Sequence, residues 1–427
     1  MRINYVGIVY NNMSALPRSV NYDDSFPSVP ADARSQDIVL PAVNGSSFSS
    51  GQTAIFDFLN TGFIDPASIY LRYTYTLVST GESSMIGCPA YAPISRLTTL
   101  VNSQLIESQS NFNQTATMLT NLTLDVAQKY GLQNAYAYGT SATPDLSQLD
   151  GRTCVANETN SVAVPLPCVL SGCEKMIPAF NMGNIRMELT IENIASIFRP
   201  DSTTLPTGFT ISNMELCYKQ ISLGSAVEEM VRSAPAVSIR SQSFLNQASV
   251  LGAGTAGQVS QTFNMRVASI KSAFMAFANG TADSNLWADS VDITKSNGSY
   301  QLNIGSVNYP QNPISTSRNK NGALQALRGA TGNIYEKSNN ASINAVEFNL
   351  EDGDATTLTE PAKYFFGVDL EKVDSEFLMS GTSSQASPIT ANIQLGTATT
   401  DAHNIHLILN YDCVLETTAD GQTALRM

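Results

Sequence analysis

The sequence predicts an all-β protein made of two β-sandwich domains. Three observations support this prediction: apolar and polar residues alternate along many short segments, clusters of turn-forming residues separate these segments, and the order of the segments repeats in the two halves. The length of 427 residues also favours two domains, because a typical domain holds about 100–200 residues.

Alternation is clearest in IRMELTIE, residues 185–192, where every second residue is apolar and the others are Arg, Glu or Thr. Similar patterns over 69–77, 364–370 and 405–415 predict further strands with one buried face. Between the strands lie stretches rich in Pro, Asn, Asp, Ser and Gly, such as PDSTTLPTG and NYPQNPIS. These stretches are typical of turns and long loops between the strands of a sandwich.

Two short helices are expected among the strands. The segment 115–131 carries an apolar stripe at helical spacing, formed by Leu119, Leu122, Val126 and Tyr130. We expect Asn113 or Thr115 to cap its start and Gly131 to end it. A second, weaker helix is predicted over 321–329.

The order of strands, helix and loops repeats, and the closing strand of each half contains a cysteine, Cys217 or Cys413. We therefore predict an N-terminal arm over 1–34, a first domain over 35–224, a linker over 225–236, and a second domain with a C-terminal tail over 237–427. The two halves show no sequence identity, so the predicted repeat concerns element order alone.

The composition argues against a nucleic-acid-binding protein. The chain has 23 basic and 36 acidic residues, a net charge of −13, and no basic stripe or arm. Charged residues make up only 14% of the chain, and such a polar, weakly charged surface suits contacts with further copies of the chain. No apolar run is long enough to span a membrane, and the first residues make a poor signal peptide.

The six cysteines, at positions 88, 154, 168, 173, 217 and 413, are scattered and contain no CxxC pair. This spacing is typical of reduced thiols in a cell interior. Cys168 and Cys173 flank a short loop and could form a local disulfide, although free thiols are favoured. A zinc site is not expected, because the two histidines lie far from the cysteines in the sequence.

Four features resemble functional motifs without matching one. GAGTAG, residues 252–257, fits the dinucleotide-binding pattern, but a β-patterned segment follows where a helix is needed, so an inter-strand loop is favoured. His403 and His406 are three residues apart in a predicted strand and point to opposite faces, as solvent-facing or interface side chains. The acidic stretch 351–360 could bind calcium but is favoured as a solvated loop. Trp287 is expected to be a packing or interface anchor. No catalytic, cofactor-binding or metal-binding residue is predicted.

Three stretches resemble a known family: FDFLNTGFIDPASIYLRYTYTL (56–77), RLTTLVNSQLIESQSNFN (96–113) and FNMRVASIKSAFMAF (263–277). They are similar to double jelly-roll major capsid proteins of tailless icosahedral DNA viruses, the lineage of adenoviruses, virophages, polinton-like viruses and nucleocytoplasmic large DNA viruses. The resemblance extends loosely over residues 35–420. It implies two tandem eight-stranded jelly-roll β-sandwiches with short helical insertions.

The resemblance also implies a function without enzyme activity. Homotrimers would form pseudo-hexagonal capsomers that tile an icosahedral virion shell, assembled inside the host cell. The expected partners are further copies of the chain, minor capsid and penton proteins, and an internal membrane beneath the shell in some members. The arm over 1–34 and the tail after Glu416 are candidate clamps between capsomers.

Two other functions remain open from sequence. A secreted or surface-displayed β-sandwich adhesin or carbohydrate-binding protein would share the polar surface and acidic charge. The missing signal peptide and the scattered cysteines argue against it. A glycosidase would need two facing carboxylates, which a fold could assemble from distant positions. This is the least favoured of the three.

Overall fold

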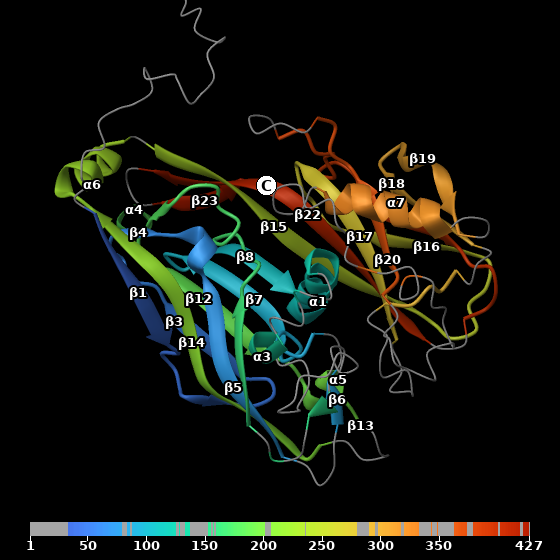
Figure 1. Cartoon of the computed structure of the whole chain (residues 1–427). Coiled ribbons are helices and arrows are strands. Elements are labelled where there is room, and N and C mark those ends of the chain that lie inside the picture. Colours follow the sequence, from blue (N-terminus) through green and yellow to red (C-terminus); the bar gives the residue numbers. More distant parts are fainter. Residues whose placement is uncertain are drawn as a thin grey trace, which may run out of the picture.

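The computed structural model describes residues 33–426 apart from 79–82, 86–87, 125–127, 129–132, 137–152, 155–156, 158, 201–205, 235, 280–289, 295–297, 317–319, 333–342, 344–347, 349–362, 374–378, 400–401 and 419–421. Two β-sandwiches pack against each other, one from the N-terminal half of the chain and one from the C-terminal half (Figure 1). Helix α6 (Ser225–Arg232) lies between them in the sequence.

The N-terminal sandwich has two main sheets. One contains β1 (Ala33–Pro41), β14 (Gly208–Leu223), β5 (Tyr70–Val78) and β10 (Thr159–Pro165), and the other contains β3 (Thr53–Asp57), β12 (Ile185–Ile191), β7 (Ile94–Val101) and β8 (Gln104–Ser110), each in that spatial order. The shorter elements are β2 (Ser47–Phe48), β4 (Phe63–Ile64), β11 (Ile177–Pro178), a separate sheet of β6 (Ser83–Met85), β9 (Thr153–Cys154) and β13 (Phe198–Pro200), and the helices η2 (Pro66–Ser68), α3 (Gln133–Tyr136), α4 (Ala179–Met182) and α5 (Ile194–Ile197).

The C-terminal sandwich is built in the same way. Its sheets are β15 (Ala236–Leu251), β22 (His403–Thr418), β17 (Ile270–Asn279) and β20 (Phe365–Asp369), and β16 (Gln258–Phe263), β21 (Ile389–Gln394), β18 (Ser299–Ile304) and β19 (Val307–Ser315). A final strand, β23 (Thr423–Arg426), pairs with β22 of its own chain.

The main strands of the two halves follow one topology. When the eight main strands of each half are numbered in chain order, both halves give one sheet in the order 1-8-3-6 and another in the order 2-7-4-5. This arrangement of two Greek keys is a jelly roll. The helices α1 (Phe112–Thr123) and α7 (Lys320–Thr331) also share a place, between the fifth and sixth main strands. The predicted repeat of element order is confirmed.

Burial follows the predicted alternation where one face of a strand is covered. In β12 every second residue from Ile185 on is buried, and in β5 every second residue from Leu71 to Leu77 is buried, while the residues between them are half-buried or exposed. In β20 the alternation is lost, because α7 packs on the strand and both faces are buried. Gly367 lies under this helix, where a Cβ atom would be 2.9 Å from the Leu327 side chain.

β7 and β8 are joined by a tight turn at Asn102 and Ser103, whose φ angles are 50° and 64°. The predicted start of the first helix is corrected. Helix α1 begins at Phe112, so Asn113 and Thr115 lie inside it and do not cap it. Asn111 precedes the helix in the left-handed conformation, and its carbonyl oxygen accepts the backbone N–H of Gln114 at 3.1 Å. The predicted end at Gly131 lies outside the described residues.

Candidate functional site: the interface between the two sandwiches

Buried polar and apolar side chains of the described residues gather where the two sandwiches meet. We call this region the inter-sandwich interface. It consists of β8, α1 and the segment 166–174 from the N-terminal half, and of β15, β17 and β22 from the C-terminal half.

The interface begins with backbone hydrogen bonds at the edge of β15. The N–H of Glu174 donates to the carbonyl oxygen of Arg240 at 3.0 Å, and the N–H of Gln242 donates to the carbonyl oxygen of Gly172 at 3.4 Å. A Cβ atom on Gly172 would lie 2.2 Å from the Gln242 oxygen, so only glycine allows this approach. The segment 172–174 therefore covers part of a sheet edge that would otherwise be open to pairing.

Glu107 is a buried acid of the interface, with a residue exposure of 4%. Its carboxyl group accepts hydrogen bonds from the Ser243 hydroxyl, from the Val169 N–H at 3.0 Å, and from other donors of its own sandwich: the Gln109 amide at 2.9 Å and the Thr99 hydroxyl at 3.3 Å. Ser243 lies on β15, so this carboxyl joins the two sandwiches. Burial raises the pKa of Glu107, because removal from water disfavours the charged form more than these hydrogen bonds favour it.

A second polar link joins α1 to β15 and β22. The Asn246 amide donates to the Asn111 carbonyl oxygen at 3.3 Å and to the Thr115 hydroxyl at 3.1 Å. The Asn246 side-chain oxygen then faces Nδ1 of His406 at 3.3 Å. Burial lowers the pKa of His406 to about 4, so the ring is neutral near pH 7, with Nδ1 as the donor in this pair.

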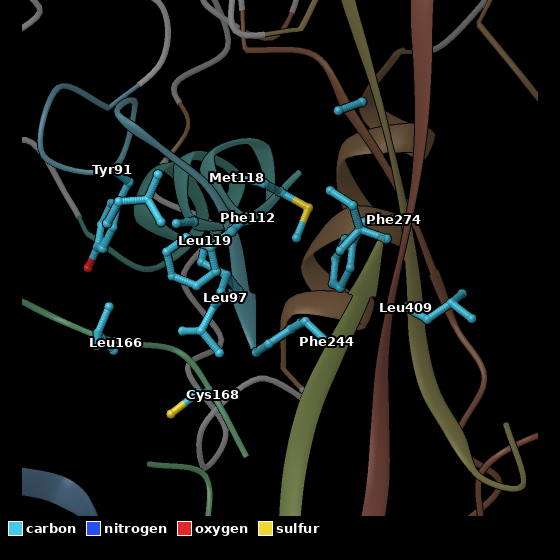
Figure 2. Close-up of a cluster of buried hydrophobic side chains, with 14 of the residues drawn as sticks. Tyr91, Leu97, Phe112, Met118, Leu119, Leu166, Cys168, Phe244, Phe274 and Leu409 are labelled. Atoms are coloured by element: carbon cyan, nitrogen blue, oxygen red, sulfur yellow. The ribbon is translucent and has the colours of Figure 1, made fainter. Parts of the chain in front are cut away.

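Apolar side chains fill the space beside these hydrogen bonds. Figure 2 shows Met118 of α1 directed toward Phe274 of β17, and Phe244 of β15 lying near Leu97. The buried apolar residues of both sandwiches form one continuous cluster. The two sandwiches are thus held together by a core and do not behave as two bodies on a tether.

Arg240 adds a charged contact at the margin of the interface. Its guanidinium lies 3.5 Å from the Glu174 carboxylate of the N-terminal sandwich and 3.3 Å from the buried carboxylate of Asp412 on β22. The Ser269 hydroxyl donates to the other oxygen of Asp412 at 3.3 Å. The buried Asp412 carboxylate is therefore both paired and hydrogen-bonded, as a buried charge requires.

Cys168, Cys173, Cys217 and Cys413 are free cysteines, and these four and Cys88 are buried. The alternative of a disulfide between Cys168 and Cys173 is therefore wrong for this structure. Burial raises the pKa of both thiols to about 12, which keeps them protonated at neutral pH.

The structure also places the other sequence candidates. GAGTAG forms the loop between β15 and β16, as predicted. His403 and His406 are both buried, so the prediction that they face solvent is wrong, and His406 pairs with Asn246 of its own sandwich. Trp287 and the acidic stretch 351–360 lie outside the described residues. In the described part of the chain, no group of three His, Cys, Asp or Glu side chains could hold a metal ion, and no helix is long and apolar enough to cross a membrane.

Sequence reasoning missed the residues that build the interface: Gly172, Glu107, Ser243 and Asn246. Glu107 and Gln109 alternate with other residues along a strand, and such a polar face predicts exposure to solvent. The sequence carries no signal that a second domain covers this face.

The chain was compared with known proteins by sequence and by structure. No protein-family profile and no curated protein matches the sequence. Many solved structures match the fold, and three of them are described here. PBCV-1 VP54 has 11% identity and a TM-score of 0.64, covering 95% of this chain and 99% of its own. The mavirus major capsid protein has 9% identity and a TM-score of 0.56, with 100% and 96% coverage. The Sputnik virophage structure has 13% identity and a TM-score of 0.58, with 100% and 93% coverage.

The fold is a double jelly roll. The full-length match in both directions means that both sandwiches and their mutual placement recur in these capsid structures. The inter-sandwich interface is therefore part of the double jelly roll and not a feature added to it. At such low identity the likeness concerns the fold, and the function is argued separately.

Proposed function

We propose that this chain is a major capsid protein whose homotrimers form pseudo-hexagonal capsomers and tile an icosahedral virion shell. The observation that carries the proposal is the pair of jelly rolls with identical strand order, fixed together by a buried interface. The match to capsid structures over 95–100% of this chain supports it.

The proposal assigns a mechanical role to the chain and no catalytic residue. The buried polar network around Glu107 joins the two domains, and its carboxyl is closed off from solvent. The Glu107 carboxyl accepts its hydrogen bonds from groups of the fold itself, as buried polar groups generally do. The role of the network is to orient one jelly roll relative to the other.

We further propose a first jelly roll over 35–224, a linker over 225–236 and a second jelly roll over 237–427. The partners would be further copies of the chain, with minor capsid and penton proteins at special positions of the shell. The arm over 1–34 remains a candidate clamp between capsomers, although only its last two residues are described, within β1. Residues 423–426 of the tail pair with β22 of their own chain, which weakens the tail as a clamp.

Electron microscopy of the purified protein tests this proposal. Hexagonal particles about one capsomer across, or closed shells, are the expected images. A field of single two-lobed particles at all concentrations and salt conditions would contradict the proposal. Binding of such monomers to immobilised glycans would instead favour the adhesin or carbohydrate-binding function.

A further inference from the structure

The outer face of one sheet in the C-terminal sandwich is built from uncharged polar side chains. In β18 and β21 every second residue is buried in the core, so the residues between them point outward, and β16 pairs beside them. The strand register places the outward residues of the sheet in rows. We call these rows the amide–hydroxyl face; they are Gln258, Gln394, Ser299 and Ser315, then Ser260, Asn392 and Gln301, then Thr262, Thr390, Asn303 and Asn308.

Side chains of this face bond to one another across neighbouring strands. The Ser260 hydroxyl donates to the Asn392 side-chain oxygen at 2.7 Å, and the Asn303 amide donates to the Asn308 side-chain oxygen at 2.8 Å. Each amide and hydroxyl group carries both a donor and an acceptor. The face is therefore complementary to a second copy of itself without any need for opposite charges.

The equivalent face of the N-terminal sandwich is charged. Its strands β3, β12 and β7 direct Asp57, Arg186, Glu188 and Arg96 outward, and the Arg186 guanidinium lies 2.7 Å from the Asp57 carboxylate. A contact with an uncharged partner would remove these ions from water without giving them new partners, which is costly. The amide–hydroxyl face carries no such cost and is the better surface for a contact between copies.

The position of the face and the charge of the chain support the same choice. β16, β18 and β19 lie on the side of the C-terminal sandwich away from the N-terminal one (Figure 1), and none of them belongs to the inter-sandwich interface. The net charge of −13 makes any two copies repel each other, and like charges held together across a contact weaken it. A face without charged side chains gives two copies a place to meet where this repulsion is small.

We propose that the amide–hydroxyl face of one copy binds the same face of a second copy in a neighbouring capsomer. The inference rests on the proposed function and specifies a surface through which capsomers meet. Because the same residues lie on both sides, the contact has two-fold symmetry. The axis passes near Asn392, which is in the middle row on a central strand of the sheet.

The size of the face sets the strength of this contact. A strand spacing of about 4.8 Å and a rise of about 3.3 Å per residue give a face of roughly 15 Å by 15 Å, or about 200 Å² per copy. A stable complex buries about 800 Å² per partner. One contact is therefore weak, and it joins capsomers only when it is repeated around each of them.

Opposite charges at Asn392 test the proposal. Asn392→Arg brings like charges together in every two-fold contact, and Asn392→Asp does the same with the other sign. Each variant should keep the trimer mass of the wild type in light scattering but need about tenfold more protein, or more, to assemble beyond the trimer. Thr98→Arg is the matched control, because Thr98 lies on the outer face of β7 in the equivalent sheet, and it should assemble like the wild type.

Mixing the two Asn392 variants separates a two-fold contact from a contact with a different surface. Arg and Asp trimers should assemble together at the wild-type concentration, because opposite charges then meet. A mixture that stays as trimers, or single variants that assemble like the wild type, would overturn the contact. Wild-type trimers that never associate further would overturn it too, whereas a wild type that stays a single chain would overturn the proposed function itself.

Thiol labelling gives a second measurement with more conservative variants. Ser260→Cys puts a thiol on the amide–hydroxyl face, and Ser110→Cys puts one at an exposed position of β8, outside it. A maleimide should label Ser260→Cys rapidly in trimers and at least tenfold more slowly in shells, while Ser110→Cys is labelled rapidly in both. Equal labelling rates of Ser260→Cys in trimers and shells would overturn the face assignment while the proposed function stands.

Discussion

The Glu107→Gln substitution should make the folded chain more stable at neutral and alkaline pH. The carboxyl lies in the inter-sandwich interface, and its hydrogen-bond partners are Ser243, Val169, Gln109 and Thr99. Glutamine has the same shape and no charge. Its amide can donate to the Thr99 hydroxyl while its oxygen accepts the Val169 N–H, so the interface keeps its links.

The pH dependence of this stability difference follows from the direction of the pKa shift of Glu107. Burial raises the pKa of Glu107 in the folded chain above the unfolded value of about 4.3. Between these two pKa values the folded state holds a proton that the unfolded state has released, so stability falls as the pH rises. The slope is about 1.4 kcal/mol per pH unit in this window, and the loss is complete above the folded pKa.

Thermal melts of the wild type and the Gln variant across pH 4 to 9 measure this effect. The two melting curves should coincide near pH 4 and separate as the pH rises, by about 2–4 °C for each kcal/mol. Glu107→Ala is the control for lost hydrogen bonds, and it should be less stable than the Gln variant by about 1–3 kcal/mol at every pH, because neither variant carries the titrating carboxyl. Equal pH dependence in the wild type and the Gln variant would refute the argument from burial.

Further predictions concern the same interface. His406→Gln should make the stability of the chain depend less on pH in acid. The pKa of His406 is about 4 in the folded chain and about 6.5 in the unfolded chain, so the wild type loses about 3 kcal/mol of stability as the pH falls through that range. Equal pH dependence of the two proteins in acid melts would contradict this. Gly172→Ala should destabilise the chain by about 1–3 kcal/mol in urea unfolding, since its Cβ atom would meet the Gln242 oxygen at 2.2 Å. Phe244→Ala should cost about 3–5 kcal/mol in the same assay, and a loss below 1 kcal/mol would place Phe244 outside the shared core. A thiol reagent should label at most one of the six cysteines in the native protein and all of them in denaturant, because five are buried; rapid labelling of several in the native state would contradict that burial.

The strands could be predicted because each has a periodic pattern that local physics produces. Alternation in β12 and β5 reflects one covered face, and this holds whatever the second layer is. The turn at Asn102 and Ser103 is hard to predict because the apolar pattern of VNSQLIES fits a continuous strand, although an Asn-Ser pair tolerates the left-handed conformation that a two-residue turn requires.

The interface could not be predicted because it depends on contacts between distant residues. Glu107 and Ser243 are 136 residues apart and meet only when both jelly rolls have formed. A buried acid on a polar strand face has the same local sequence as an exposed one. Likewise, the alternation of β20 gave no warning that α7 would cover its second face.

The native mass of the purified protein tests the central claim of self-assembly most directly. Light scattering after size exclusion, at low micromolar concentration, should give a trimer of three times 45.7 kDa, or larger shells built from it. A mass of one chain that does not change with concentration or salt would contradict a capsid protein and leave a double jelly roll with another function.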